Sequence, residues 1–239
     1  NTGAYRFVVA RNLSDLGARD ERFLRQTYRA VVGARGTFNT DWKYEVAFNY
    51  GRFTENTNAS GYVDKQRFML ALDAGRNPVT GNIECRAKFD ANSAVAFPNN
   101  AGNTARLAAD IAACVPYNPF GQGNNSASIN YFSVNYGNNS QMAQTDISGY
   151  VAGDTSDFLN LPGGPIDFVL GGEYRRETAR YEQDAFGASG NTNAVAFGDF
   201  LPPPFKVTEG FAELRVPLFK NQPFLEELTL RGAARVSDY

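Results

Sequence analysis

The chain has 239 residues, with 23 basic and 25 acidic side chains and a formal net charge of −2. This balance gives no strong basic field, so we expect no nucleic-acid partner. The sequence contains no histidine, which excludes Ser-His-Asp and Cys-His catalysis and His-ligated zinc or haem within the chain. No carboxylate pair, phosphate loop or metal-binding spacing fits a known chemistry. We therefore expect no enzymatic activity, no cofactor and no metal.

The clearest pattern along the chain is an alternation of apolar and polar side chains. Residues 42–50 alternate in this way, as in a strand with one apolar face. The preceding segment, 28–36, alternates similarly, and residues 38–41 join the two as a tight hairpin. The apolar residues of the second segment are Trp42, Tyr44, Val46, Phe48 and Tyr50.

The same alternation predicts further strands at 166–175 and 228–237, and weaker ones at 143–151 and 208–216. With a first strand at 5–10, the sequence predicts about seven strands. The connections also follow an order along the chain, since short or moderate ones alternate with long ones. The short or moderate connections are 38–41, 153–164 and 217–227, and the long ones are 54–140 and 181–205. Long loops at one end and short turns at the other are typical of an outer-membrane barrel rather than a soluble sandwich.

The longest connection, 54–140, has features of its own. Its apolar spacing predicts short helices at 61–73 and 104–113, the second with Thr104 as its N-cap, whereas the Asn- and Ser-rich stretch 124–139 is expected to be mobile. It also contains both cysteines, Cys85 and Cys114. In an exported protein they would form a disulfide that closes a loop of about 30 residues and contributes roughly 3.5 kcal/mol, whereas in the cytosol two free thiols would be expected.

Three local sequence patterns resemble those of TonB-dependent outer-membrane receptors. The first is FAELRVPL at 211–218, followed by PFLEELTL at 223–230 and RVSDY at 235–239. The second is LPGGP at 161–165, leading to GGEYRRE at 171–177. The third is GNIECR at 81–86, followed by CVPYNPFG at 114–121. Together they cover most of the chain from residue 28 onward.

This resemblance implies an all-β fold, an antiparallel meander forming part of a large outer-membrane transmembrane β-barrel, with short helices in a long loop. Residues 1–239 would be a partial barrel and 54–140 an extracellular loop. Such receptors close 22 strands around a plug domain, and neither the plug nor the TonB-contacting segment is recognisable in this chain.

The resemblance also implies a function and a location, the cell outer membrane. The chain would be a segment of a receptor for energy-coupled uptake of a scarce nutrient, such as a siderophore or a glycan. Its partners would be that nutrient, outer-membrane lipid and, through regions outside this chain, the plug and the TonB energy-coupling protein. The exported context favours the Cys85–Cys114 disulfide.

Both strand faces allow a second interpretation. The aromatic face would form interfacial girdles in a membrane, or the core of a soluble sandwich in a secreted lectin- or adhesin-like binding module. The polar face would line a lumen, which is polar whether substrate, plug or water fills it. The polar-face residues are Lys43, Glu45, Asn49, Glu173, Arg175, Glu209, Glu213, Arg215, Arg231 and Arg235.

The candidate ligand-binding residues lie in two places. Tyr117, Asn118 and Phe120 follow the second cysteine, and aromatic rings with amides suit stacking and hydrogen bonding to a small molecule. The alternative is that they pack the loop onto itself. Glu173, Arg175 and Arg215 are the candidates on the polar strand faces.

Overall fold

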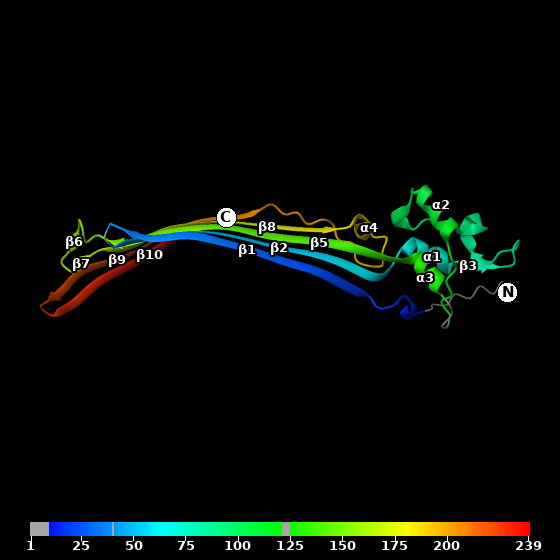
Figure 1. The fold of residues 1–239 in the computed structure, drawn as a ribbon, viewed down its shortest axis with the longest axis horizontal. Helices are drawn as coiled ribbons and strands as arrows, with labels where there is room; N and C mark the ends of the chain where they lie inside the picture. The colour runs from blue at the N-terminus through cyan, green and yellow to red at the C-terminus, as the bar shows by residue number, and fades with distance from the viewer. Residues whose placement is uncertain (1–9, 40, 121–124) are drawn as a thin grey trace. The chain divides into compact units, whose positions relative to one another are not determined.

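The computed structural model describes residues 10–39, 41–120 and 125–239. Six strands form one sheet in which each strand lies beside its neighbours in the chain (Figure 1). These strands are β1 (Asp20–Phe38), β2 (Trp42–Val63), β5 (Ser133–Asp154), β8 (Asp167–Gln183), β9 (Phe205–Gln222) and β10 (Leu225–Asp238). The antiparallel meander expected from the sequence is confirmed, as shown by the antiparallel pairs β8–β9 and β9–β10. The strand expected at 5–10 lies outside the described residues apart from Ala10.

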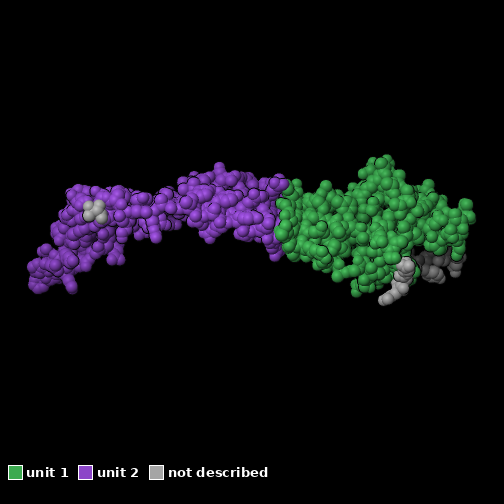
Figure 2. Space-filling view, viewed as in Figure 1, with its two compact units in different colours: residues 1–24, 56–139, 182–199 green, residues 25–55, 140–181, 200–239 purple. Residues whose placement is uncertain are grey.

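The chain divides into two compact units, which Figure 2 shows in different colours. Unit 1 comprises residues 1–24, 56–139 and 182–199. Unit 2 comprises residues 25–55, 140–181 and 200–239. Unit 1 contains the helices and the disulfide, and unit 2 contains strand segments with their short connections.

The short connections are those expected, with one difference. β1 ends at Phe38 and β2 begins at Trp42, as predicted. The expected connection at 217–227 is much shorter, because β9 continues to Gln222 and β10 begins at Leu225. Asn221, near the end of β9, and Phe224, in the turn itself, adopt left-handed backbone conformations, with φ of 55° and 68°. Between β5 and β8, the two-residue strands β6 (Asn160–Leu161) and β7 (Gly164–Pro165) pair with each other.

The long connection is shorter than the expected 54–140, because strand residues extend into both of its ends. β2 continues to Val63 and β5 begins at Ser133. The remaining segment contains α1 (Lys65–Leu72), β3 (Ala74–Arg76), β4 (Ile83–Cys85), α2 (Thr104–Ala113) and α3 (Ser126–Phe132). Short 3-10 turns lie at Ser14–Leu16, Arg86–Lys88, Ala91–Ser93 and Pro98–Asn100, and α4 (Ala185–Ala188) precedes β9.

Both predicted helices are present, with different boundaries or caps. The helix expected at 61–73 is shorter, since Asp64 caps α1 by accepting hydrogen bonds from two backbone amides at its start. The helix at 104–113 is confirmed, but its cap is Asn103, whose side chain accepts from the Arg106 amide. The stretch 124–139 was expected to be mobile, and its described part forms α3 and the start of β5.

The core of unit 1 surrounds a disulfide between Cys85 and Cys114, which confirms the predicted pairing. The ring of Phe132, from α3, packs edge-on against Phe68 of α1 and against Tyr117, with centroids 5.1 and 5.3 Å apart. The short helices are therefore held by shared apolar packing rather than by their own length.

A buried network of charges joins α1 to α2 in the same unit. Arg106 lies 2.6 Å from Asp64, and Arg67 lies 2.8 Å from Asp110. The Gln66 amide donates to Asp110 at 2.6 Å. Both carboxylates are almost fully buried, so each needs these cationic and amide partners. Burial lowers the pKa of Arg67, but the hydrogen bond and charge of Asp110 outweigh it, and the net shift is upward.

Candidate functional site

The sheet in unit 2 has two faces of different chemistry. On the apolar face, Trp42 and Phe168 bring their rings to 4.8 Å, and Val46 lies against Gly149 of the intervening strand. The register of β8 and β9 places Leu170 opposite Ala212 on this face. The apolar face, as used below, consists of Trp42, Tyr44, Val46, Phe48, Tyr50, Phe168, Leu170, Tyr174, Ala212, Leu214, Leu230 and Val236.

Much of the apolar face is exposed, which is unusual for apolar side chains of a sheet in a soluble protein. Val46 is 53% exposed and Leu170 is 52% exposed, whereas Glu45 and Glu173 are partly buried. Among the described residues of unit 2, the elements outside the six strands are β6 and β7, of two residues each, which are too small to cover this face. Exposed apolar surface of this extent marks an interaction surface.

Aromatic rings gather at the end of the apolar face where β1 turns into β2. The ring of Phe38 lies 5.6 Å from that of Trp42, and the Trp42 Nε1 donates to the Asp154 carbonyl at 3.0 Å. At the other end of this face, Tyr50 and Tyr174 close the apolar stretch on β2 and β8. Amphipathic rings therefore bound the aliphatic residues on both sides.

The polar face is joined across strands by ion pairs and hydrogen bonds. Arg215 of β9 lies 2.9 Å from Asp167 of β8 and 3.1 Å from Glu227 of β10. Glu209 accepts from Arg235 of β10 at 3.3 Å, and Arg25 of β1 pairs with Glu55 of β2. These ion pairs link neighbouring strands of the polar face, on which Arg215 also lies in register opposite Arg231, and Glu173 opposite Glu209.

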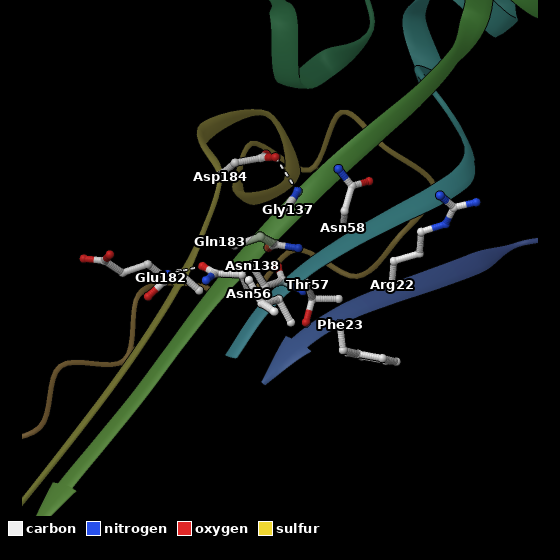
Figure 3. A pocket seen from close by; sticks show the side chains of 12 residues that line it. Arg22, Phe23, Asn56, Thr57, Asn58, Gly137, Asn138, Glu182, Gln183 and Asp184 are labelled. Carbon is white, nitrogen blue, oxygen red and sulfur yellow. Dashed lines mark hydrogen bonds between the residues drawn. The ribbon is translucent and has the colours of Figure 1, made fainter. Parts of the chain in front are cut away.

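A groove of about 650 Å³ lies in unit 1 and is lined by residues of four neighbouring strands (Figure 3). Each contributes three consecutive residues: 22–24 from β1, 56–58 from β2, 137–139 from β5, and 182–184 from β8 and the residue after it. The lining is rich in carboxamides, namely Asn56, Asn58, Asn138, Asn139 and Gln183.

Some groove residues are occupied in holding the fold. Asp184 accepts from the Gly137 amide at 2.5 Å, drawn as a dashed line in Figure 3, and from Gly187 in α4 at 2.7 Å. Gln183 accepts from the Phe197 amide at 2.9 Å. By contrast, the Oδ1 atom of Asn138 is buried and has no hydrogen-bond partner among the described residues. A buried acceptor without a donor is unfavourable.

The predicted ligand residues of the loop lie in unit 1 and differ in accessibility. Tyr117 is buried in the core beside the disulfide, and its hydroxyl donates to Asp15 at 3.0 Å. Burial, together with this hydrogen bond and the Asp15 charge, raises the pKa of Tyr117. Asn118 accepts from Asn125 through its carbonyl at 3.0 Å. Phe120 is 61% exposed and is the most accessible of the three.

The predicted ligand residues of the strands lie in unit 2, on the polar face. Arg175 lies 3.7 Å from Glu173 and 3.4 Å from Glu177 on the same strand. Arg215 is occupied by its two carboxylate partners on β8 and β10. The six candidates are therefore divided between two units, and none of them lines the carboxamide groove.

The described residues hold no group of three or more His, Cys, Asp or Glu arranged to bind a metal ion. Among the helices of the described chain, none has both the length and the hydropathy needed to cross a membrane. The sequence matches no protein-family model and no curated protein.

Proposed function

We propose that this chain is a segment of a TonB-dependent outer-membrane receptor whose strands cross the membrane with the apolar face toward lipid. The single observation that supports this most directly is the exposure of Val46, Leu170 and their neighbours on that face. In water, such a surface is unfavourable by about 25 cal/mol per Å² of apolar area. Acyl chains would cover it without a second protein layer.

The lengths of the elements agree with this proposal. The apolar stretch of β2 runs from Trp42 to Tyr50, which is close to the roughly 9–11 residues that a tilted strand needs to cross the hydrocarbon layer. Trp and Tyr at its two ends suit the two membrane–water interfaces. In an antiparallel meander, the segments 64–132 and 184–204 both follow strands that run in the same direction, so they belong at the same, outer end.

The function that follows is uptake of a scarce nutrient across the outer membrane. The polar face, on which Arg215 pairs with Asp167 and Arg235 pairs with Glu209, would face an enclosed passage and the plug. Coupling to the inner membrane through TonB, and the plug itself, come from the family resemblance and involve regions outside this chain. The nutrient would bind first at the outer end.

The carboxamide groove is the candidate contact for that nutrient. Carboxamides donate and accept at once, so the groove suits the hydroxyl and amide groups of a glycan or of a siderophore backbone. The same observation favours the second candidate function, a secreted lectin-like binding module. That module needs a partner layer over the apolar face, and the described part of unit 2 supplies none.

Two adjacent residues of β8, Leu170 and Val169, point to opposite faces of the sheet and therefore provide a test of the membrane proposal. Leu170→Arg places a charge on the apolar face, and Val169→Arg places it on the polar face, opposite Glu213. The measurement is a urea titration of the full-length protein as it folds into liposomes. Near the midplane, Leu170→Arg should reduce the free energy of unfolding by about 2–4 kcal/mol, and Val169→Arg should reduce it far less. Equal costs, or failure of the unmodified protein to insert, would overturn the membrane proposal.

A further inference from the structure

Two basic residues lie directly opposite each other at one border of the apolar face. Arg176 of β8 pairs in register with Lys206 of β9, six residues beyond the pair Leu170 and Ala212. Because strand side chains alternate, an even spacing puts Arg176 and Lys206 on the same face as Leu170. Both are exposed.

Neither of these two cations forms an ion pair within the described residues. Arg175, their neighbour on the polar face, lies within 3.7 Å of both Glu173 and Glu177. Asp238, opposite Thr208 on the apolar face, pairs with neither Arg176 nor Lys206. Like charges directly opposite each other on neighbouring strands are destabilising. An anion between them would remove that cost.

A third cation continues the pattern on β2. Arg52 follows Tyr50 by two residues, as Arg176 follows Tyr174, so each strand changes from apolar to basic immediately beyond a tyrosine. Arg52 has a neutral partner, since its Nη2 donates to Gln141 at 2.9 Å. One depression in unit 2 is lined by Arg52, Glu177 and Phe205. Glu177 and Phe205 point to the opposite face but are the neighbours in sequence of Arg176 and Lys206, so the depression shows the level along the strands at which the three cations lie. The three cations therefore belong to one part of the sheet.

We propose that Arg52, Arg176 and Lys206 bind the phosphate groups of a phosphorylated lipid headgroup in the membrane around the protein. Tyrosines favour the headgroup level of a bilayer, which places the cations just beyond them among phosphates. Arginine offers a planar fork for bidentate phosphate contacts, and lysine adds a point charge. Strands β2 and β8 are two strand spacings apart, about 10 Å, so a headgroup with two phosphates suits the site.

A lipid rather than a free phosphate ion is the expected ligand. The cations lie on the face that carries exposed Leu170 and Val46, where the acyl chains of the same lipid would pack. This inference rests on the proposed membrane function. Its test therefore measures lipid binding in detergent, separately from insertion into vesicles, so that failure of one is distinguishable from failure of the other.

The experiment titrates the detergent-solubilised, full-length protein with diphosphoryl lipid A and counts bound lipid by native mass spectrometry. The double variant Arg176→Gln/Lys206→Gln should bind roughly tenfold more weakly for each side chain neutralised. The control Lys43→Gln/Arg231→Gln removes the same charge from the polar face and should leave binding unchanged. Heat-modifiability on gels verifies that both variants are folded.

Four results would overturn the inference. They are equal binding of dephosphorylated lipid A, unchanged binding by the double variant, an equal loss in the polar-face control, and full competition by inorganic phosphate. Tighter binding of the phosphorylated lipid that depends on Arg176 and Lys206 supports it, whether or not the protein later inserts into vesicles.

Discussion

The indole of Trp42 lies against the backbone of Gly153 on the neighbouring part of the sheet. A Cβ atom at Gly153 would lie 2.6 Å from Trp42 Cδ1, closer than van der Waals contact permits. The indole is held from a second side, because its Nε1 donates to the carbonyl of Asp154. A glycine and a tryptophan thus fit together at the end of the apolar face where the turns are short.

This fit predicts a specific coupling between the two positions. Gly153→Ala should destabilise the folded protein by about 1–3 kcal/mol, because the indole must move. In a Trp42→Ala background the added cost should be much smaller, and the difference is the coupling energy. Gly210→Ala is the control, since a Cβ there meets nothing within 4 Å. Equal effects of Gly153→Ala in both backgrounds, measured by urea unfolding, would contradict the predicted packing.

Trp42 also reports on the membrane proposal, because it is the sole tryptophan of the sequence. In liposomes its emission should shift to shorter wavelength and be quenched by lipids that carry a quencher near the headgroup, more than by one deep in the acyl chain. Aqueous iodide should quench it weakly. Strong iodide quenching with no lipid quenching would place the indole in water and remove support for an aromatic girdle.

The sequence predicted the strands well where one face had to be apolar. The alternation in 42–50 and 166–175 reflects a sheet with two different faces, and this pattern is local. The first residues of β1 and the helix α3 were not predicted. Helix α3 lies in an Asn- and Ser-rich stretch, and its Phe132 is held by the rings of Phe68 and Tyr117, both distant in sequence. Such tertiary packing overrides local propensity.

The carboxamide groove could not be found from the sequence. Its lining combines four segments that are separated by long stretches of chain. Only strand pairing brings Asn56 close to Asn139, whose side-chain amide donates to the Oδ1 atom of Asn56 at 2.5 Å. An Asn residue in a strand segment does not by itself indicate a binding site. The loop aromatics were more conspicuous, yet Tyr117 is buried in the core. A residue type that suits a ligand also suits packing, and burial decides between them.

The disulfide should stabilise unit 1 strongly. Because Cys85 and Cys114 are the two cysteines of the sequence, a reductant acts on this bond alone. Reduction, or the double change Cys85→Ser/Cys114→Ser, should cost up to roughly 3.5 kcal/mol and should increase proteolysis within residues 64–132. A thiol count that finds two free cysteines in the unreduced, denatured protein would refute the bond.

The buried charge network predicts a large difference between two arginines. Arg106→Ala leaves Asp64 and Asp110 short of a cation in a buried site and should cost about 3–5 kcal/mol. Arg86→Ala removes a half-exposed pair with Asp73 and should cost about 0–1 kcal/mol. Amide hydrogen exchange in α1 and α2 measures the loss of stability in each of the two variants. Similar exchange rates in the two variants would mean that the network contributes little to stability.

Asp15 and Tyr117 should make the stability of unit 1 depend on pH at both extremes. Burial raises the pKa of Asp15, but hydrogen bonds from Asn125 and Tyr117 outweigh it, so its pKa lies below the ordinary 3.8. Its contribution is present above 3.8 and is lost as the pH falls through the folded value. The pKa of Tyr117 lies above the ordinary 10.0, so its contribution is present below 10.0 and is lost as the pH rises through the folded value.

The Asp15→Asn variant separates the causes of the Tyr117 shift. It removes the charge and changes the hydrogen bond that Tyr117 donates, so the pKa of Tyr117 should fall. The largest cause, burial beside the disulfide, remains, so the pKa should stay above 10.0. NMR titration of the labelled tyrosine ring carbon measures the shift, and Tyr117→Phe identifies the signal. A Tyr117 pKa that Asp15→Asn leaves unchanged would show that the carboxylate does not interact with the phenol in solution.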